Sequence, residues 1–226
     1  DELVVVENMR PDSAGVLNRP ARKLSDRHGD LSFVTCTKNW GVWPRFQVAQ
    51  WMGTDWIAVF DDDTTPGPRW LEACLRTAEE FGEHVYGVNG IAYPCGVMSH
   101  RAYFGHTVPV DMLIECDIVG NAWFFPRKLC ERMNLAPDWQ QHPSCGEDYW
   151  LSVMAQQAGK KTYCMPWTTW APEFCGATAG DTSGGDEHAL WKRPGEEDRR
   201  NERHEAYRSM GWRTRAVKLG PKLEDG

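Results

Sequence analysis

Residues 56–68 have the sequence WIAVFDDDTTPGP, and this stretch decides the fold. Five apolar residues are typical of a buried β-strand, and three aspartates and a proline-containing turn follow them directly. The carboxylates therefore come at the carboxyl end of a strand, which is the edge where open α/β sheets bind ligands. Carboxylate oxygens suit Mg²⁺ or Mn²⁺ beside a diphosphate. The alternative is an acidic turn, but three adjacent carboxylates repel one another unless a cation is present.

Outward from this stretch, short apolar runs alternate with segments of helical periodicity, which predicts an α/β fold with a largely parallel, Rossmann-like sheet flanked by helices. After Pro68, a stripe of Leu71, Cys74, Leu75 and Ala78 predicts the inner face of a helix. We expect strands within 3–6, 31–36, 56–60, 84–91, 118–125 and 162–165. We expect helices after Pro44, after Pro68, from Glu147, and over 196–208.

Length and composition limit the possible classes of protein. The chain of 226 residues fits one compact domain, and 41% hydrophobic residues exclude a wholly disordered chain. A formal net charge of −7 argues against broad attraction to nucleic-acid phosphates. No stretch is long and apolar enough to predict a transmembrane helix, so we expect a cytoplasmic location. Eight cysteines without a C-x-x-C pair predict reduced thiols.

A second acidic feature opens the helix predicted from Glu147, where the sequence over 146–150 is GEDYW. Acidic residues at a helix start are favoured by the helix dipole, so a capping role and a catalytic role are equal alternatives for this pair taken alone. Near the aspartates, one of these carboxylates could accept a proton from an attacking hydroxyl as a general base.

Taken in order along the chain, these features resemble the nucleotide-sugar-dependent glycosyltransferases of the GT-A fold, and the family-2 type most closely. The resemblance covers about residues 3–193 and extends in part to the carboxyl-terminal domain of the exostosin group. The segments that carry it are Glu7-Asn8, Asn39-Trp40-Gly41 with Arg45, Asp61-Asp62-Asp63 with its DxD pattern, Val119-Gly120-Asn121, and Gly146-Glu147-Asp148. It implies a single GT-A catalytic domain over 1–194, with a mobile loop at about 175–190, followed by a charged helix or tail over 195–226.

The resemblance also implies roles for particular residues. Asp63 and His188 would hold Mn²⁺ or Mg²⁺, and Asp148 would be the general base, with Glu147 the less favoured candidate. Nucleotide or substrate contacts are expected from Glu7, Asn8, Asn39, Arg45, Asp61, Asp62, Gly120, Asn121, Trp150 and Arg193. A loop cap or a surface hydrogen bond is an equal alternative for the first four of these, and a core position is the alternative for Trp150. We expect His204 on a solvated helix face.

The expected activity is metal-dependent transfer of a sugar from a nucleoside-diphosphate sugar to a hydroxyl acceptor, with inversion at the anomeric carbon. The acceptor class stays open between a glycan, a lipid, a small molecule and a modified nucleic-acid base. A closer likeness to the exostosin group would imply retention instead. Two other functions remain as alternatives: a metal-dependent phosphoryl or nucleotidyl transferase, and an inactive carbohydrate- or nucleotide-binding module.

Overall fold

The structure is a computed structural model that describes residues 2–8, 31–61, 64–96, 100–105, 108–109, 111–135, 145–168, 171–176 and 192–215. Its elements, in chain order, are β1 (Leu3–Asn8), β2 (Leu31–Cys36), α2 (Pro44–Ala49), β3 (Trp56–Phe60), α3 (Trp70–Phe81), β4 (Val85–Ala92), β5 (Ala102–Phe104), β6 (Ile114–Cys116), β7 (Ile118–Pro126), η1 (Arg127–Leu135), α4 (Glu147–Gln157), β8 (Thr162–Cys164), η2 (Pro172–Phe174) and α5 (Glu196–Ser209). In these ranges no helix is long and apolar enough to span a bilayer.

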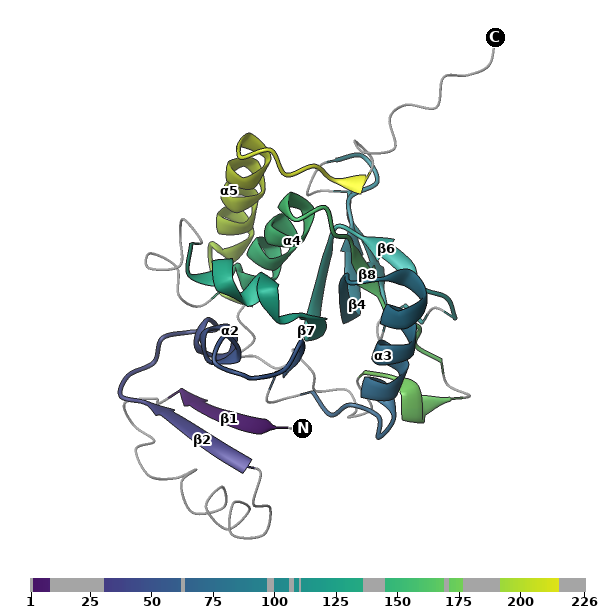
Figure 1. Ribbon diagram of the computed structural model, residues 1–226. Helices are drawn as coiled ribbons and strands as arrows, with labels where there is room; N and C mark the ends of the chain where they lie inside the picture. The colour runs from purple at the N-terminus through teal and green to yellow at the C-terminus, as the bar shows by residue number, and fades with distance from the viewer. Residues whose placement is uncertain are drawn as a thin grey trace.

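The main sheet has six strands in the order β3-β7-β4-β8-β6, and β5 pairs with β4. Strands β4 and β8 are parallel, whereas β7 runs antiparallel between β3 and β4. The expected α/β class is therefore confirmed, and the sheet is mixed because β7 is inserted between strands that point the same way. Helix α3 covers one face of this sheet, and α4 and α5 lie on the other side (Figure 1).

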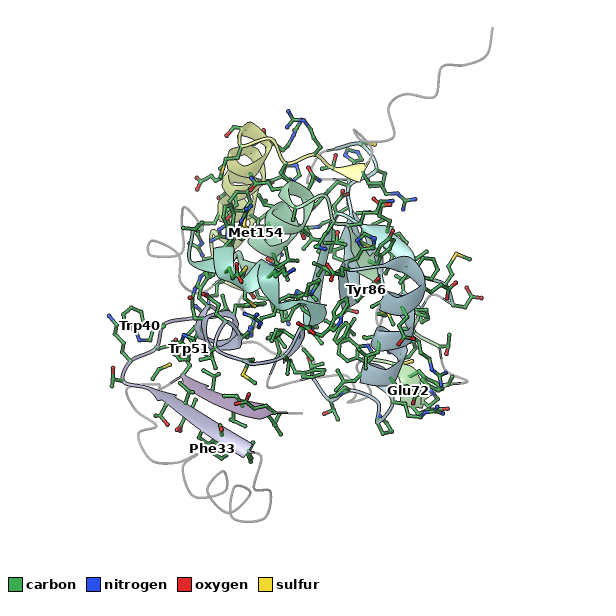
Figure 2. The ribbon with its side chains drawn as sticks, in the orientation of Figure 1. Phe33, Trp40, Trp51, Glu72, Tyr86 and Met154 are labelled. Carbon is green, nitrogen blue, oxygen red and sulfur yellow. The ribbon has the colours of Figure 1, made fainter. Side chains whose placement is uncertain are left out.

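The sheet separates two hydrophobic cores. One core joins α3 to the sheet through Trp70, Tyr86 and Phe124, and the other joins α4 and α5 to the opposite face. Alternation along β7 explains this division, because successive side chains of a strand point to opposite faces. Figure 2 labels one residue of each core: Tyr86 beside α3, and Met154 on α4.

The buried face of helix α3 differs from the predicted one. The helix begins at Trp70, one residue before the predicted stripe. Its buried side chains are Trp70, Cys74 and Ala78, whereas Leu71 and Leu75 are 46% and 44% exposed. The prediction that these two leucines face the core is therefore wrong. The bulky indole of Trp70 is fully buried at the first helical position, and this rotates the buried face of the helix away from both leucines.

Strands β1 and β2 form a parallel pair that, within the described residues, shares no backbone pairing with the main sheet. The pair lies beside α2, away from β4 and β7 (Figure 1). We expected a buried strand at 3–6, but Leu3 is 61% exposed and Val5 is 38% exposed. Among the described residues no second layer of strands or helices covers this pair, so these apolar side chains are exposed there.

Helix α5 contributes to the same core as α4. Tyr207 and Trp212 are buried with Trp150, and their rings pack around His204 and Tyr149. The expectation that His204 lies on a solvated face is wrong, because only 1% of the residue is exposed. A domain boundary at residue 194 stays a prediction, and this packing argues for a unit that continues through α5. All eight cysteines are free thiols, and five of them are buried.

Candidate active site

The tip of strand β3 is built by the backbone of Asn121. The Asn121 carbonyl accepts hydrogen bonds from the Asp61 N–H at 3.3 Å and from the Thr64 hydroxyl at 3.1 Å. Asn121 has φ of +67°, in the left-handed region that asparagine tolerates better than most residues. This conformation aims its carbonyl at the strand tip and so fixes where Asp61 leaves the sheet. Asp62 and Asp63 lie outside the described residues.

Arg45 connects the strand tip to the start of helix α4. Its Nη1 donates to a carboxylate oxygen of Asp61, and its Nη2 donates to Glu147 Oε1 at 2.7 Å. The guanidinium carbon lies 4.9 Å from the centre of the Trp123 ring, and the Arg45 side chain is only 21% exposed. The two acidic features predicted from the sequence, which lie far apart in the chain, are therefore brought together by one largely buried guanidinium.

The two carboxylates at the start of α4 have different surroundings. Glu147 is 8% exposed, and burial raises its pKa to about 8, although the positive charge of Arg45 opposes the shift. Asp148 is half-buried, and its Oδ1 accepts a hydrogen bond from the Tyr149 N–H at 2.8 Å. Burial also raises the pKa of Asp148, while the charges of Arg200 and Arg203 lower it.

These surroundings suit the two carboxylates to different tasks. Glu147 is engaged by Arg45, so it is placed to hold the helix start against the strand tip. Asp148 forms no ion pair within the part of the chain that the structure describes, and part of its surface reaches solvent. A half-buried carboxylate with a raised pKa can accept a proton from a hydroxyl.

The asparagines expected at the nucleotide bind one another. Asn8 Nδ2 donates to Asn39 Oδ1 at 3.0 Å, and Asn8 Oδ1 accepts the Trp40 N–H at 2.8 Å. Asn39 Oδ1 also accepts the Gly41 N–H at 2.8 Å, so the pair closes the loop between β2 and α2. Glu7 accepts a hydrogen bond from the neighbouring strand. These bonds match the loop-cap alternative, and nucleotide contacts from these residues stay predictions.

Trp40 is exposed beside this loop. It is 39% exposed, and the Lys38 ammonium lies 3.7 Å from the centre of its ring. Figure 2 shows Trp40 and the still more exposed Trp51 in the region of α2.

Three other predicted contacts differ in accessibility. A side chain at Gly120 would meet no atom of the described residues within 4 Å, so this position is open on the part of the chain that the structure describes. Trp150 is 3% exposed and donates its indole N–H to the Arg132 carbonyl at 3.0 Å, so it occupies the core and offers no surface to a ligand. Arg193 is exposed just before α5.

The proposed cation ligands Asp63 and His188 lie outside the described residues, as do residues 177–190 of the expected loop. Where the structure is described, no group of three His, Cys, Asp or Glu side chains is arranged to hold a metal ion. The acidic tip still has the oxygen donors that a hard divalent cation prefers, because the chain continues from Asp61 into two more aspartates.

Sequence reasoning missed two parts of this site. The first is the backbone role of Asn121, for which a polar residue after a glycine inside an apolar strand was the only signal. The second is the pair of arginines on α5, Arg200 and Arg203, whose charges act on Asp148. Their segment is so densely charged that it indicated a solvated helix, although Glu196 and Arg203 stand two helical turns apart and are both buried.

Comparisons with known proteins bear on the fold and the family of this chain. A crystal structure of GalNAc-T7 with UDP, GalNAc and Mn²⁺ superposes with a TM-score of 0.55 at 11% sequence identity. The match covers 73% of this chain and 36% of that one, and it confirms the expected GT-A type of fold. No curated protein matches the sequence. Residues 1–132 match the family described as glycosyl transferase family 2. With more than half of its length matched, the chain belongs to glycosyl transferase family 2.

Proposed function

We propose that the protein transfers a sugar from a nucleoside-diphosphate donor to a hydroxyl acceptor, with inversion at the anomeric carbon and with Asp148 as the general base. One observation carries the proposal: Arg45 joins Asp61 at the strand tip to Glu147 at the helix start, and Asp148 is the next residue. A donor held at the tip would then lie beside a carboxylate able to accept a proton.

On the donor side, we propose that Asp63 holds Mn²⁺ or Mg²⁺, with His188 as a further ligand. The oxygen donors of the acidic tip fit such a cation, and the similar GalNAc-T7 structure was solved with UDP and Mn²⁺. When bound, the cation supplies Lewis-acid stabilisation to the departing diphosphate. Arg45 cannot replace it, because both ends of its guanidinium are already engaged by Asp61 and Glu147.

On the acceptor side, Asp148 takes the proton of the acceptor hydroxyl while the oxygen attacks the anomeric carbon. The bond from that carbon to the diphosphate oxygen breaks with its electron pair, so the products are the inverted glycoside and the nucleoside diphosphate. Burial raises the pKa of Asp148, and a carboxylate with a raised pKa is a stronger base for this step. Glu147 and Arg45 keep the helix start in place during it.

A binding experiment tests the donor class. Thermal unfolding is measured with UDP, other nucleoside diphosphates and their sugars, each with and without Mn²⁺, because a ligand that binds the native state raises the unfolding temperature. We expect one diphosphate to stabilise the protein only with Mn²⁺, and Asp63→Asn to abolish that effect. Asp198→Asn, an exposed aspartate on α5, is the matched control. The absence of any diphosphate effect would refute the proposal.

A product experiment tests the chemistry. With the donor identified, release of nucleoside diphosphate and the anomeric configuration of the product are followed by NMR. We expect Asp148→Asn to lower kcat by about 100-fold or more while the donor still raises the unfolding temperature. Retained configuration would refute inversion with Asp148 as base. A sugar phosphate in place of a glycoside would instead indicate phosphoryl transfer.

A further inference from the structure

Helix α5 packs directly against the turn that precedes α4. Arg203 is 5% exposed; its Nη2 donates to Cys145 Sγ at 2.8 Å, and its Nη1 donates to Glu196 Oε1 at 3.3 Å. Gly146 has φ of +96°, and a side chain there would meet Cδ and Nε of Arg203 at 3.1 Å. The arginine therefore lies against the backbone immediately before Glu147 and Asp148.

Arg203 is itself held in place. Glu196, the first residue of α5, is 2% exposed and also accepts a hydrogen bond from Arg199 Nε at 3.0 Å. The Nε of Arg200 lies 3.9 Å from the same carboxylate. A buried ion pair of this kind adds little net stability, because desolvation of the two charges offsets their attraction. Its main physical effect is to fix where the guanidinium points.

Several charged and titratable groups surround Asp148. The charges of Arg200 and Arg203, both on α5, lower its pKa, while burial raises it. On α4, Glu147 is electrostatically coupled to Asp148. The hydroxyls of Tyr93 and Tyr149, 2.5 Å apart, are also electrostatically coupled to it. The positive charge that faces the proposed base therefore comes from α5, which follows α4 in the chain and lies beyond the part matched to the family.

We propose that Arg203, with Arg200 beside it, is a positioning residue for Asp148: it fixes the turn at Gly146 from which Asp148 follows, and it places positive charge on the α5 side of that carboxylate. Only the role of Asp148 as the general base rests on the proposed function. The placement of the arginines can be tested without any substrate.

A positioning role and a purely structural role predict opposite changes in Asp148. If the arginine charge is removed while the packing persists, the carboxylate loses its favourable electrostatic partner, and its titration midpoint rises. If the substitution merely loosens the turn, Asp148 becomes hydrated and its midpoint falls toward that of an ordinary aspartate. The sign of the shift therefore separates the two roles.

The experiment is a pH titration of the full chain labelled with ¹³C at the aspartate carboxyl carbons, in which the Asp148 signal is identified by its loss in Asp148→Asn. Arg203→Met keeps the aliphatic stem against Gly146 and removes the charge. Arg200→Met removes the neighbouring positive charge at a side chain that is 29% exposed, so folding is less at risk. Arg208→Met, on the same helix and paired with Glu205, is the matched control.

We expect the Asp148 midpoint to rise by about half a pH unit or more in Arg203→Met and Arg200→Met, and to stay unchanged in Arg208→Met. An unchanged or lowered midpoint in Arg200→Met, with the fold intact, would overturn the inference. If Arg203→Met does not fold, Arg200→Met decides alone. Once a donor is known, the acidic limb of the plot of kcat against pH should also shift to higher pH in these two variants. A shifted titration in a protein that turns over no donor would refute the proposed function while supporting the placement of the arginines.

Discussion

Glu147→Gln should change how the stability of the protein depends on pH. In the folded protein, burial raises the pKa of Glu147 from 4.5 to about 8, so between these values the folded chain holds a proton that the unfolded chain has released. Wherever the folded state binds more protons, the free energy of unfolding falls as pH rises. The contribution of Glu147 is therefore fully present below about pH 4.5 and is lost as pH rises through about 8.

For one such group the free energy of unfolding changes by at most about 1.4 kcal/mol per pH unit. Glu147 can therefore account for a change of at most about 4 kcal/mol between pH 5 and pH 8. That is a large share of the roughly 5–15 kcal/mol typical of a folded domain. Glutamine has nearly the same shape, and its side-chain oxygen can still accept the Nη2 hydrogen bond of Arg45. The variant should lose the pH-dependent contribution and keep the contact.

The assay is urea unfolding at pH 5, 6, 7 and 8 at constant ionic strength, with the free energy taken by linear extrapolation. Wild type should lose more stability than Glu147→Gln across this range. The exposed Glu79, on α3, provides the control Glu79→Gln, which should have the wild-type slope. Equal slopes in Glu147→Gln and wild type, with equal m-values, would refute the reasoning.

Three further predictions follow from single positions. Asn121→Val should lower the free energy of unfolding by about 1–2 kcal/mol in urea, because a branched residue is strained at φ of +67°, while Asn121→Gly should be tolerated; equal stability of both variants would contradict this. Arg45→Lys should lower the free energy of unfolding by about 1–3 kcal/mol, because one ammonium does not reproduce the forked contact with Asp61 and Glu147. Calorimetry should show this loss of stability growing from about pH 6 to about pH 9. Burial lowers the pKa of His204 below 6.5, so its contribution is present above about pH 6.5 and is lost in acid. The unfolding temperature should fall with acid more steeply in wild type than in His204→Phe; parallel curves would argue against this.

The sequence predicted the elements well where local signals were strong. Pro44 and Glu147 begin helices as expected, and the run before Asp61 is a strand. It predicted the buried face of α3 less well, because whether Trp70 or Leu71 enters the core depends on the sheet beneath the helix. The apolar pattern also did not predict the exposure of Leu3 and Val5 in β1, because burial of a strand depends on which other elements pack over it.

For the site, sequence spacing identified both acidic features but not the contact between them. Arg45 was expected at the nucleotide, which stays a prediction, and its contacts with Asp61 and Glu147 were not expected. A local pattern cannot show which of several carboxylates a long side chain will reach. The same holds for α5, where the high charge of the segment concealed a buried glutamate and a buried arginine.

The packing of α5 has a consequence for synthesis on the ribosome. Tyr149 and Trp150 leave the exit tunnel well before Tyr207 and Trp212, the side chains that cover them. Until those last aromatics emerge, the nascent chain exposes part of its core and lacks the support behind Gly146. A chaperone that shields aromatic surface would be most needed during this interval, and the site would be assembled only when translation has passed α5.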